Sequence, residues 1–188
     1  MKKVEIITSP NPILRKKAKE VEKIDVNAME IIEDMILALE SSEIEGLAIA
    51  APQIGKSVRI IIVRVREQRD KEGKIIQKAI PLTAYINPKI TRFSKEKVSI
   101  EEGCLSCPNL YGEVDRPKKV RLEAKDIKGK KIKINASGLL ARVFQHEIDH
   151  LDGILFIDKV IDKSKIREID PVEREKEKSK RRSQNEKS

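Results

Sequence analysis

The only two histidines of this 188-residue chain lie four residues apart, in the stretch QHEIDHLDG at residues 145–153. Residues at positions i and i+4 of an α-helix project from the same face, so His146 and His150 can ligate one cation. Leu139 and Val143 precede them at the same spacing, and the histidines therefore continue an apolar stripe. This pattern predicts a buried helix at the floor of a cleft, with the other elements packed around it.

The pattern His-Glu-x-x-His on a helix is typical of metal-dependent hydrolysis. Two imidazoles and a third ligand leave one coordination position for water, and the cation lowers the pKa of that water to about 7. Glu147 lies next to His146 and can accept and return the proton. The alternative is that both histidines pack in the core or cap a helix end. The motif favours the interpretation that they bind a metal.

A third ligand has to come from another segment, and EEGCLSCPN at residues 101–109 offers Cys104 and Cys107. Two cysteines and two histidines also match a closed zinc site without a catalytic water. The gap between Cys107 and His146 is longer than in small zinc fingers. If the segment is extended, its two cysteines point to opposite faces and only one can ligate. An open, catalytic site is favoured, and the closed Cys2His2 site stays an alternative.

The other segments predict an α+β fold in which antiparallel or mixed sheets pack around the central helix. Helical periodicity predicts an N-terminal helix over residues 28–41, with Asn27 and Glu30 as its capping box. Ser137-Gly138 predicts the start of the central helix and Gly153 its end. Strand patterns occupy residues 57–65, 83–90, 96–103 and two segments within 118–136 that flank DIKGK, and an exposed hairpin is expected around Gly73.

The length favours one domain over residues 1–162, followed by a charged tail at 163–188 that is either helical or disordered. No apolar run is long enough for a membrane span, and no signal peptide is recognisable, so a cytoplasmic protein is expected. The net charge of +9 suggests an acidic partner. The basic tail is either a solvated end or a contact to RNA; neither DNA nor a membrane is expected as a partner.

Three segments together resemble the motifs of the peptide deformylase family: GLAIAAPQIG at 46–55, EGCLS at 102–106 and QHEIDH at 145–150. The resemblance implies an α+β fold with the histidine-bearing helix packed against sheets. It also implies removal of the formyl group from the N-terminal methionine of newly made polypeptides, with release of formate. The implied cofactor is one Fe²⁺ per chain, which Zn²⁺, Ni²⁺ or Co²⁺ could replace.

The resemblance also implies a role for each matching residue. Cys104, His146 and His150 hold the metal, Glu147 is the general base and then the acid, and Cys107 packs. The side chain of Gln53 and the backbone N–H of Leu105 form the oxyanion pocket. The residues implied to contact the substrate are Gly46, Ala48, Ile49, Leu139 and Val143.

One position departs from the family pattern, because Ala48 and Ile49 stand where the family has its second glycine and a leucine. A methyl group at Ala48 could crowd the substrate or conflict with a positive φ. Two alternatives to an efficient deformylase therefore remain. One is a deformylase-like protein with reduced activity, and the other is a non-catalytic zinc-stabilised module that binds RNA or the ribosome.

Overall fold

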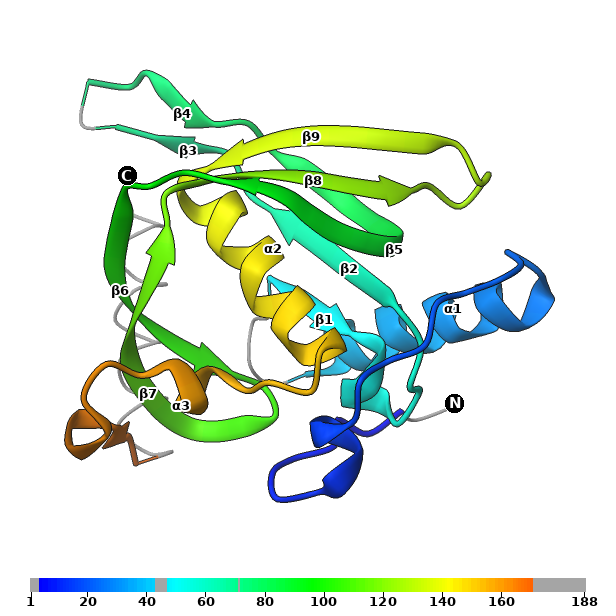
Figure 1. Cartoon of the computed structure of the whole chain (residues 1–188), viewed down its shortest axis with the longest axis horizontal. Coiled ribbons are helices and arrows are strands. Elements are labelled where there is room, and N and C mark those ends of the chain that lie inside the picture. Colours follow the sequence, from blue (N-terminus) through cyan, green and yellow to red (C-terminus); the bar gives the residue numbers. More distant parts are fainter. Residues whose placement is uncertain (1–3, 43–46, 71, 171–188) are drawn as a thin grey trace.

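The computed structural model describes residues 4–42, 47–70 and 72–170. They form an α+β fold in which a central helix lies among antiparallel sheets, as predicted (Figure 1). The helices are α1 (Val26–Ser41), α2 (Gly138–Leu151), α3 (Phe156–Lys159) and the 3₁₀ turns η1 (Pro12–Arg15), η2 (Ala51–Ile54) and η3 (Lys163–Lys165). The strands are β1 (Ala48–Ala50), β2 (Ile60–Val65), β3 (Gln68–Arg69), β4 (Ile75–Gln77), β5 (Ile80–Phe93), β6 (Lys97–Cys104), β7 (Cys107–Pro117), β8 (Lys119–Lys125), β9 (Lys131–Ser137) and β10 (Arg167–Glu168).

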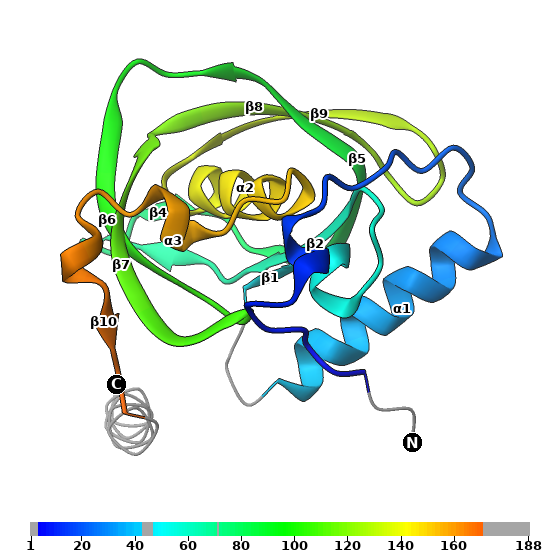
Figure 2. The same ribbon diagram turned by 60° about the horizontal axis from the view of Figure 1, so that its bottom comes forward.

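Two main sheets shape the molecule, and neighbouring strands in both are antiparallel. The larger has the strand order β1-β2-β5-β8-β9, the smaller has the order β10-β7-β6, and β3 and β4 form a separate hairpin. Figure 2 shows α2 with strands of both main sheets around it. The parallel pairing that a mixed sheet would need does not occur between the named strands of the described chain.

Helix α2 is buried because its apolar side chains pack against one face of the larger sheet. Phe144 and Leu151 are fully buried there, and the ring of Tyr85 from β5 meets Phe144 edge-to-face at a centroid distance of 5.3 Å. Burying one such side chain stabilises the fold by about 1.5–3 kcal/mol. The helix begins after Ser137, as predicted, and Gly153 adopts a φ of +75° just beyond its end.

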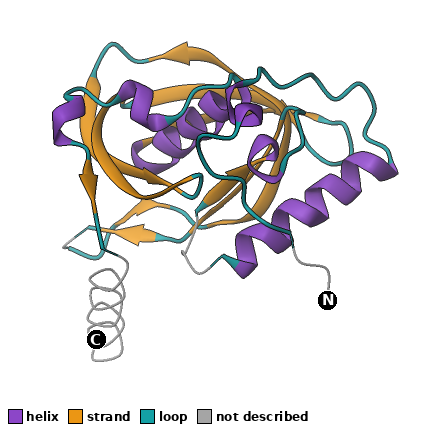
Figure 3. Ribbon diagram, turned by 90° about the horizontal axis from the view of Figure 1, so that it is seen from below, coloured by secondary structure: helices purple, strands orange, loops and turns teal. Residues whose placement is uncertain are grey.

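Helix α1 covers the opposite face of the same sheet, on the outside of the molecule (Figure 3). Its predicted cap was wrong. Asp25, rather than Asn27, caps the helix, because the Asp25 side chain accepts a hydrogen bond from the backbone N–H of Ala28. Both residues are good N-caps, and periodicity alone did not distinguish two sites two residues apart.

The chain beyond Asp162 continues the folded body for several residues. Residues 163–170, assigned to the tail from the sequence, include η3 and β10. Arg167 and Glu168 of β10 pair with Tyr111 and Leu110 of β7, which adds a third strand to the smaller sheet. Residues 171–188, the rest of the predicted tail, lie outside the described residues. In the described chain, no helix has the length and apolarity that a membrane span requires.

Candidate metal centre and active site

Three side chains predicted as metal ligands meet on the pocket-facing side of α2. His146 and His150 lie one turn apart on the helix, and Cys104 lies at the end of β6. One ligand atom from each residue lies within 4.8 Å of the others, and His150 Nε2 is 3.2 Å from Cys104 Sγ. Two nitrogens and one sulfur that converge in this way suit a tetrahedral divalent cation with one position left for water.

Cys107 is not one of the three clustered ligands. The sequence argument that an extended segment would turn the two cysteines to opposite faces does not apply. The segment is a tight turn rather than an extended strand: Leu105 and Ser106 join β6 to β7, and Cys104 pairs directly with Cys107. The Cys107 side chain packs in an apolar cluster with residues such as Leu14. Among the described residues, the only cluster with metal-ligand geometry contains Cys104 and not Cys107.

A buried carboxylate orients the first histidine. Glu102 Oε2 lies 2.9 Å from His146 Nδ1, which directs the Nε2 side of the ring toward the ligand cluster. Arg116 donates to both oxygens of Glu102, at 2.6 and 2.9 Å, and Arg142 donates to Oε1. Burial alone would raise the pKa of Glu102, but the hydrogen bonds from His146 and Arg116 hold that pKa far below its usual value. A carboxylate behind a ligating imidazole fixes the orientation of the ring.

The charged chain continues through the core on the other side of Arg116. Arg116 Nη1 donates to Asp149 at 2.7 Å, and Lys159 Nζ donates to the second oxygen of Asp149, also at 2.7 Å. Glu102, Arg116 and Asp149 are all less than 10% exposed. The sequence interpretation missed them, although Glu102 lies within EGCLS and Asp149 within QHEIDH.

Glu147 lines the pocket beside the ligand cluster and is 5% exposed. Burial raises the pKa of Glu147 to about 7, which suits a group that exchanges protons at neutral pH. Burial also lowers the pKa of His150 well below its usual value, so this ring is neutral and has a lone pair for a metal. Glu147 Oε2 and His150 Nδ1 are buried without a hydrogen-bond partner among the described residues.

Gln53 is fixed on the other side of Cys104 by three contacts. Its Oε1 accepts from the N–H of Ala50 at 2.8 Å, and its Nε2 donates to Ser106 Oγ at 3.1 Å and lies 3.7 Å from Cys104 Sγ. The side chain is 2% exposed, so its orientation is set by these contacts. Leu105 lines the same pocket from the turn after Cys104. An amide donor is therefore held at the ligand cluster.

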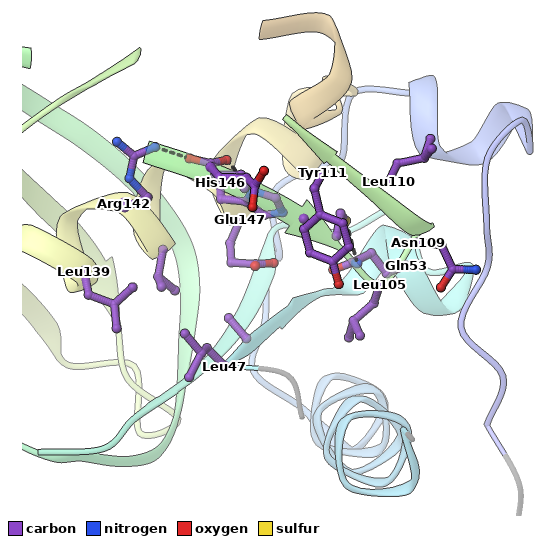
Figure 4. A pocket seen from close by; sticks show the side chains of 16 residues that line it. Leu47, Gln53, Leu105, Asn109, Leu110, Tyr111, Leu139, Arg142, His146 and Glu147 are labelled. Atoms are coloured by element: carbon purple, nitrogen blue, oxygen red, sulfur yellow. Dashed lines mark hydrogen bonds and ion pairs between the residues drawn. The ribbon is translucent and has the colours of Figure 1, made fainter. Parts of the chain in front are cut away.

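These residues surround a cavity of about 330 Å³. Figure 4 shows Leu47 and Leu139 at one end of the pocket and Asn109 and Leu110 at the other. Leu47, Tyr111 and Arg142 line it without having been predicted. The pocket is lined by Leu47, Ala48, Gln53, Glu101, Glu102, Gly103, Cys104, Leu105, Asn109, Leu110, Tyr111, Leu139, Arg142, Val143, His146 and Glu147.

The predicted substrate residues fall into three groups. Ala48, Leu139 and Val143 line the pocket. The prediction for Ile49 needs correction, because strand alternation turns its side chain to the opposite face, where it is fully buried against the α1 side of the sheet. Gly46 lies outside the described residues.

Backbone strain at Ala48 is excluded. Asn87 and Asn109 are the only non-glycine residues with a positive φ in the described chain, so Ala48 has an ordinary strand conformation. The methyl group of Ala48 lines the pocket, and the backbone at this residue is unstrained.

The residues present fit a divalent cation. The donor set of one sulfur and two imidazoles, the Glu102 carboxylate behind His146 and the unpartnered Glu147 oxygen are all features of a catalytic metal site. Fold and site together define the chain as an α+β metallohydrolase.

Comparison with known proteins identifies which one. The family model described as polypeptide deformylase matches residues 3–166, and the chain belongs to this family. Its members are metalloenzymes that remove the N-formyl group from nascent polypeptides.

Several relatives match most of the chain. Peptide deformylase of Thermomicrobium roseum is 43% identical over 170 residues, which cover 90% of this chain and 93% of the relative. Peptide deformylase 1B of Solanum lycopersicum is 36% identical over 159 residues, 85% of this chain; the chain spans only 53% of that chloroplastic relative. The solved peptide deformylase of Thermotoga maritima has a TM-score of 0.72 and 34% identity, over 86% of this chain and 100% of that one.

Proposed function

We propose that this chain removes the formyl group from the N-terminal methionine of newly synthesised polypeptides and releases formate. The observation that carries the proposal is the buried carboxylate of Glu147, which lies beside three converging metal-ligand atoms in one open pocket. A structural metal site needs no such carboxylate, whereas hydrolysis needs a group that takes and returns a proton.

The strand edges around the pocket support binding of the substrate as an added strand. β1 is at one edge of the larger sheet, and β6 is at one edge of the smaller sheet. Leu47 O accepts from Arg64 of β2, and hydrogen-bonded positions alternate along antiparallel strands. The N–H and C=O of Ala48 therefore face away from β2 and can pair with a peptide backbone.

The side chain of the formylated methionine is placed by apolar residues of α2. Val143 lies about one turn and Leu139 about two turns before His146, and both line the pocket. Met is unbranched and adapts to an apolar cavity of this size. We assign the methionine subsite to these two residues.

The proton and the developing charge are handled by the chain's own groups. Glu147 accepts a proton from the attacking water and delivers it to the departing amine. Gln53 Nε2 and the backbone N–H of Leu105 stabilise the negative charge on the formyl oxygen. Cys104, His146 and His150 would hold the cation, which when bound supplies the Lewis acidity that makes a water nucleophilic at neutral pH. Ferrous iron is the proposed native metal, with zinc, nickel and cobalt as substitutes.

The proposal is tested by release of formate from formyl-Met-Ala, measured anaerobically with the iron-loaded chain. Glu147→Gln should reduce kcat by about 10²–10⁴-fold, because it removes general acid–base catalysis. Metal content should stay at one equivalent. An active Glu147→Gln variant would contradict the role of Glu147, and an inactive parent chain with full metal content would contradict the proposed function.

A ribosome contact through the basic segment 171–188 is proposed on charge alone. The segment holds seven Lys and Arg and four Asp and Glu. Binding of this kind would depend strongly on salt. Deletion of residues 171–188 should reduce co-sedimentation with ribosomes at low salt; equal co-sedimentation of both chains would contradict the contact. A cytoplasmic location is proposed with it and is tested by cell fractionation.

A further inference from the structure

The two cysteines of the chain face each other across the turn that ends β6 and begins β7. Cys104 and Cys107 are direct cross-strand partners, separated only by Leu105 and Ser106. Directly opposite residues of an antiparallel pair have Cα atoms about 4.5–5.5 Å apart, and their side chains point to the same face. This spacing is within the range of about 4.4–6.8 Å that a disulfide requires. Cys104 also packs against the apolar cluster that contains Cys107.

The surroundings of the two sulfurs differ. Cys104 lines the substrate pocket and is partly exposed, so a small oxidant reaches it through the open side of that pocket. Cys107 is 2% exposed and lies behind it in the apolar cluster with Leu14 and Phe156. One thiol is thus accessible, and a second is held beside it.

From this pairing we propose that Cys104 and Cys107 form a reversible disulfide when the protein meets a peroxide. In the first step, the sulfur of Cys104 attacks one oxygen of hydrogen peroxide, the O–O bond breaks, and sulfenic acid and water form. In the second step, the sulfur of Cys107 attacks the sulfur of Cys104. The S–S bond forms, the S–O bond breaks, and the hydroxyl leaves as water with the proton of the Cys107 thiol. The two cysteines lose two electrons in total, and one peroxide is reduced to two waters.

The disulfide would change the metal site in a defined way. Cys104 would no longer supply a thiolate, and two imidazoles alone would hold the cation more weakly. In exchange, Cys104 would be protected from sulfinic and sulfonic acids, which thiols do not reduce. The bridge closes a loop of only four residues and adds little stability, so thiols should reduce it readily. Cys107 would act as a resolving residue that preserves the site and takes no part in deformylation.

This inference rests on the proposed metal site, so its test uses readouts other than deformylation. The full-length zinc-loaded chain is treated with hydrogen peroxide and quenched with catalase; zinc is chosen because it has no redox chemistry of its own. Intact mass, a peptide map of residues 98–118 and zinc release to a chromophoric chelator are then measured. The parent chain should lose two hydrogens within that peptide and release its zinc. A thiol reductant followed by added zinc should restore mass and metal content.

The matched control is Cys107→Val, which keeps a small apolar side chain in the cluster; Cys107→Ser serves if the valine variant folds poorly. Before oxidation, the control should bind one zinc like the parent. After oxidation, it should gain two or three oxygens at Cys104, and the reductant should not restore its zinc binding. The proposal is overturned if the parent also gains oxygens without forming the bridge, if the bridge links two chains, or if the control recovers as fully as the parent. None of these outcomes depends on whether the chain removes formyl groups.

Discussion

The hairpins β8–β9 and β6–β7 are built in opposite ways. In β8–β9, alternate residues Val120, Leu122 and Ala124 are buried and apolar, and polar residues face outward. In β6–β7, the buried inward positions include Glu102 and Arg116, which form an ion pair with each other. Each also pairs with a charged side chain of α2, Glu102 with Arg142 and Arg116 with Asp149. One hairpin is held by apolar burial, while the other buries charge in order to position a metal ligand.

This difference shows what the metal site requires of the fold. A buried ion pair is no stronger a source of stability than apolar packing, but removing one partner leaves an uncompensated charge. The β6–β7 hairpin should therefore be sensitive to changes that the β8–β9 hairpin tolerates.

The largest expected effect comes from Glu102→Gln. It leaves Arg116 and Arg142 without their carboxylate, and the free energy of unfolding should fall by about 3–5 kcal/mol. Metal affinity should fall by about 10–100-fold, because the charged acceptor that orients His146 is replaced by a neutral amide. The measurements are urea unfolding of the full-length chain and chelator competition.

The matched control in the other hairpin is Glu123→Gln. Glu123 lies 3.2 Å from the exposed Lys133, and such surface pairs contribute about 0–1 kcal/mol. Equal losses of stability in the two variants would contradict the contrast between the hairpins.

A smaller effect is expected from acid. The folded-state pKa of Glu102 lies below its usual value, so its stabilising contribution is fully present above an unfolded pKa of about 4.3. It is lost as the pH falls through the lower folded pKa. When the pH is lowered from 6, the free energy of unfolding should therefore fall more for the parent chain than for the Glu102→Gln variant. Parallel pH profiles of the two chains would show that Glu102 does not carry this dependence.

An effect on stability alone is expected in the β8–β9 turn. Gly129 has a φ of +79°, and a methyl group there would meet only Ile24, at 3.8 Å. Gly129→Ala should cost about 1–2 kcal/mol from backbone strain and leave deformylation unchanged. A loss of activity in this variant would mean that the β8–β9 turn also acts on the site.

The contrast between apolar and charged buried positions also explains which elements could be predicted from the sequence. The β8–β9 hairpin and α2 follow regular hydrophobic patterns, and both were predicted correctly. β7 was missed because its inward positions include a buried arginine. β5 is longer than expected at both ends, over residues 80–82, where Pro81 argues against a strand, and over residues 91–93. Glu102 and Asp149 were visible next to the motif residues, but a single sequence does not show that they share one buried arginine. Tyr111 and Leu47 reach the pocket only through long-range strand pairing.

X-ray absorption at the zinc edge of the loaded, reduced chain tests the metal site most directly. One sulfur, two imidazole nitrogens and one light solvent atom are predicted, from Cys104, His146, His150 and water. Two sulfurs would place Cys107 on the metal as well, close the site to water and contradict hydrolysis.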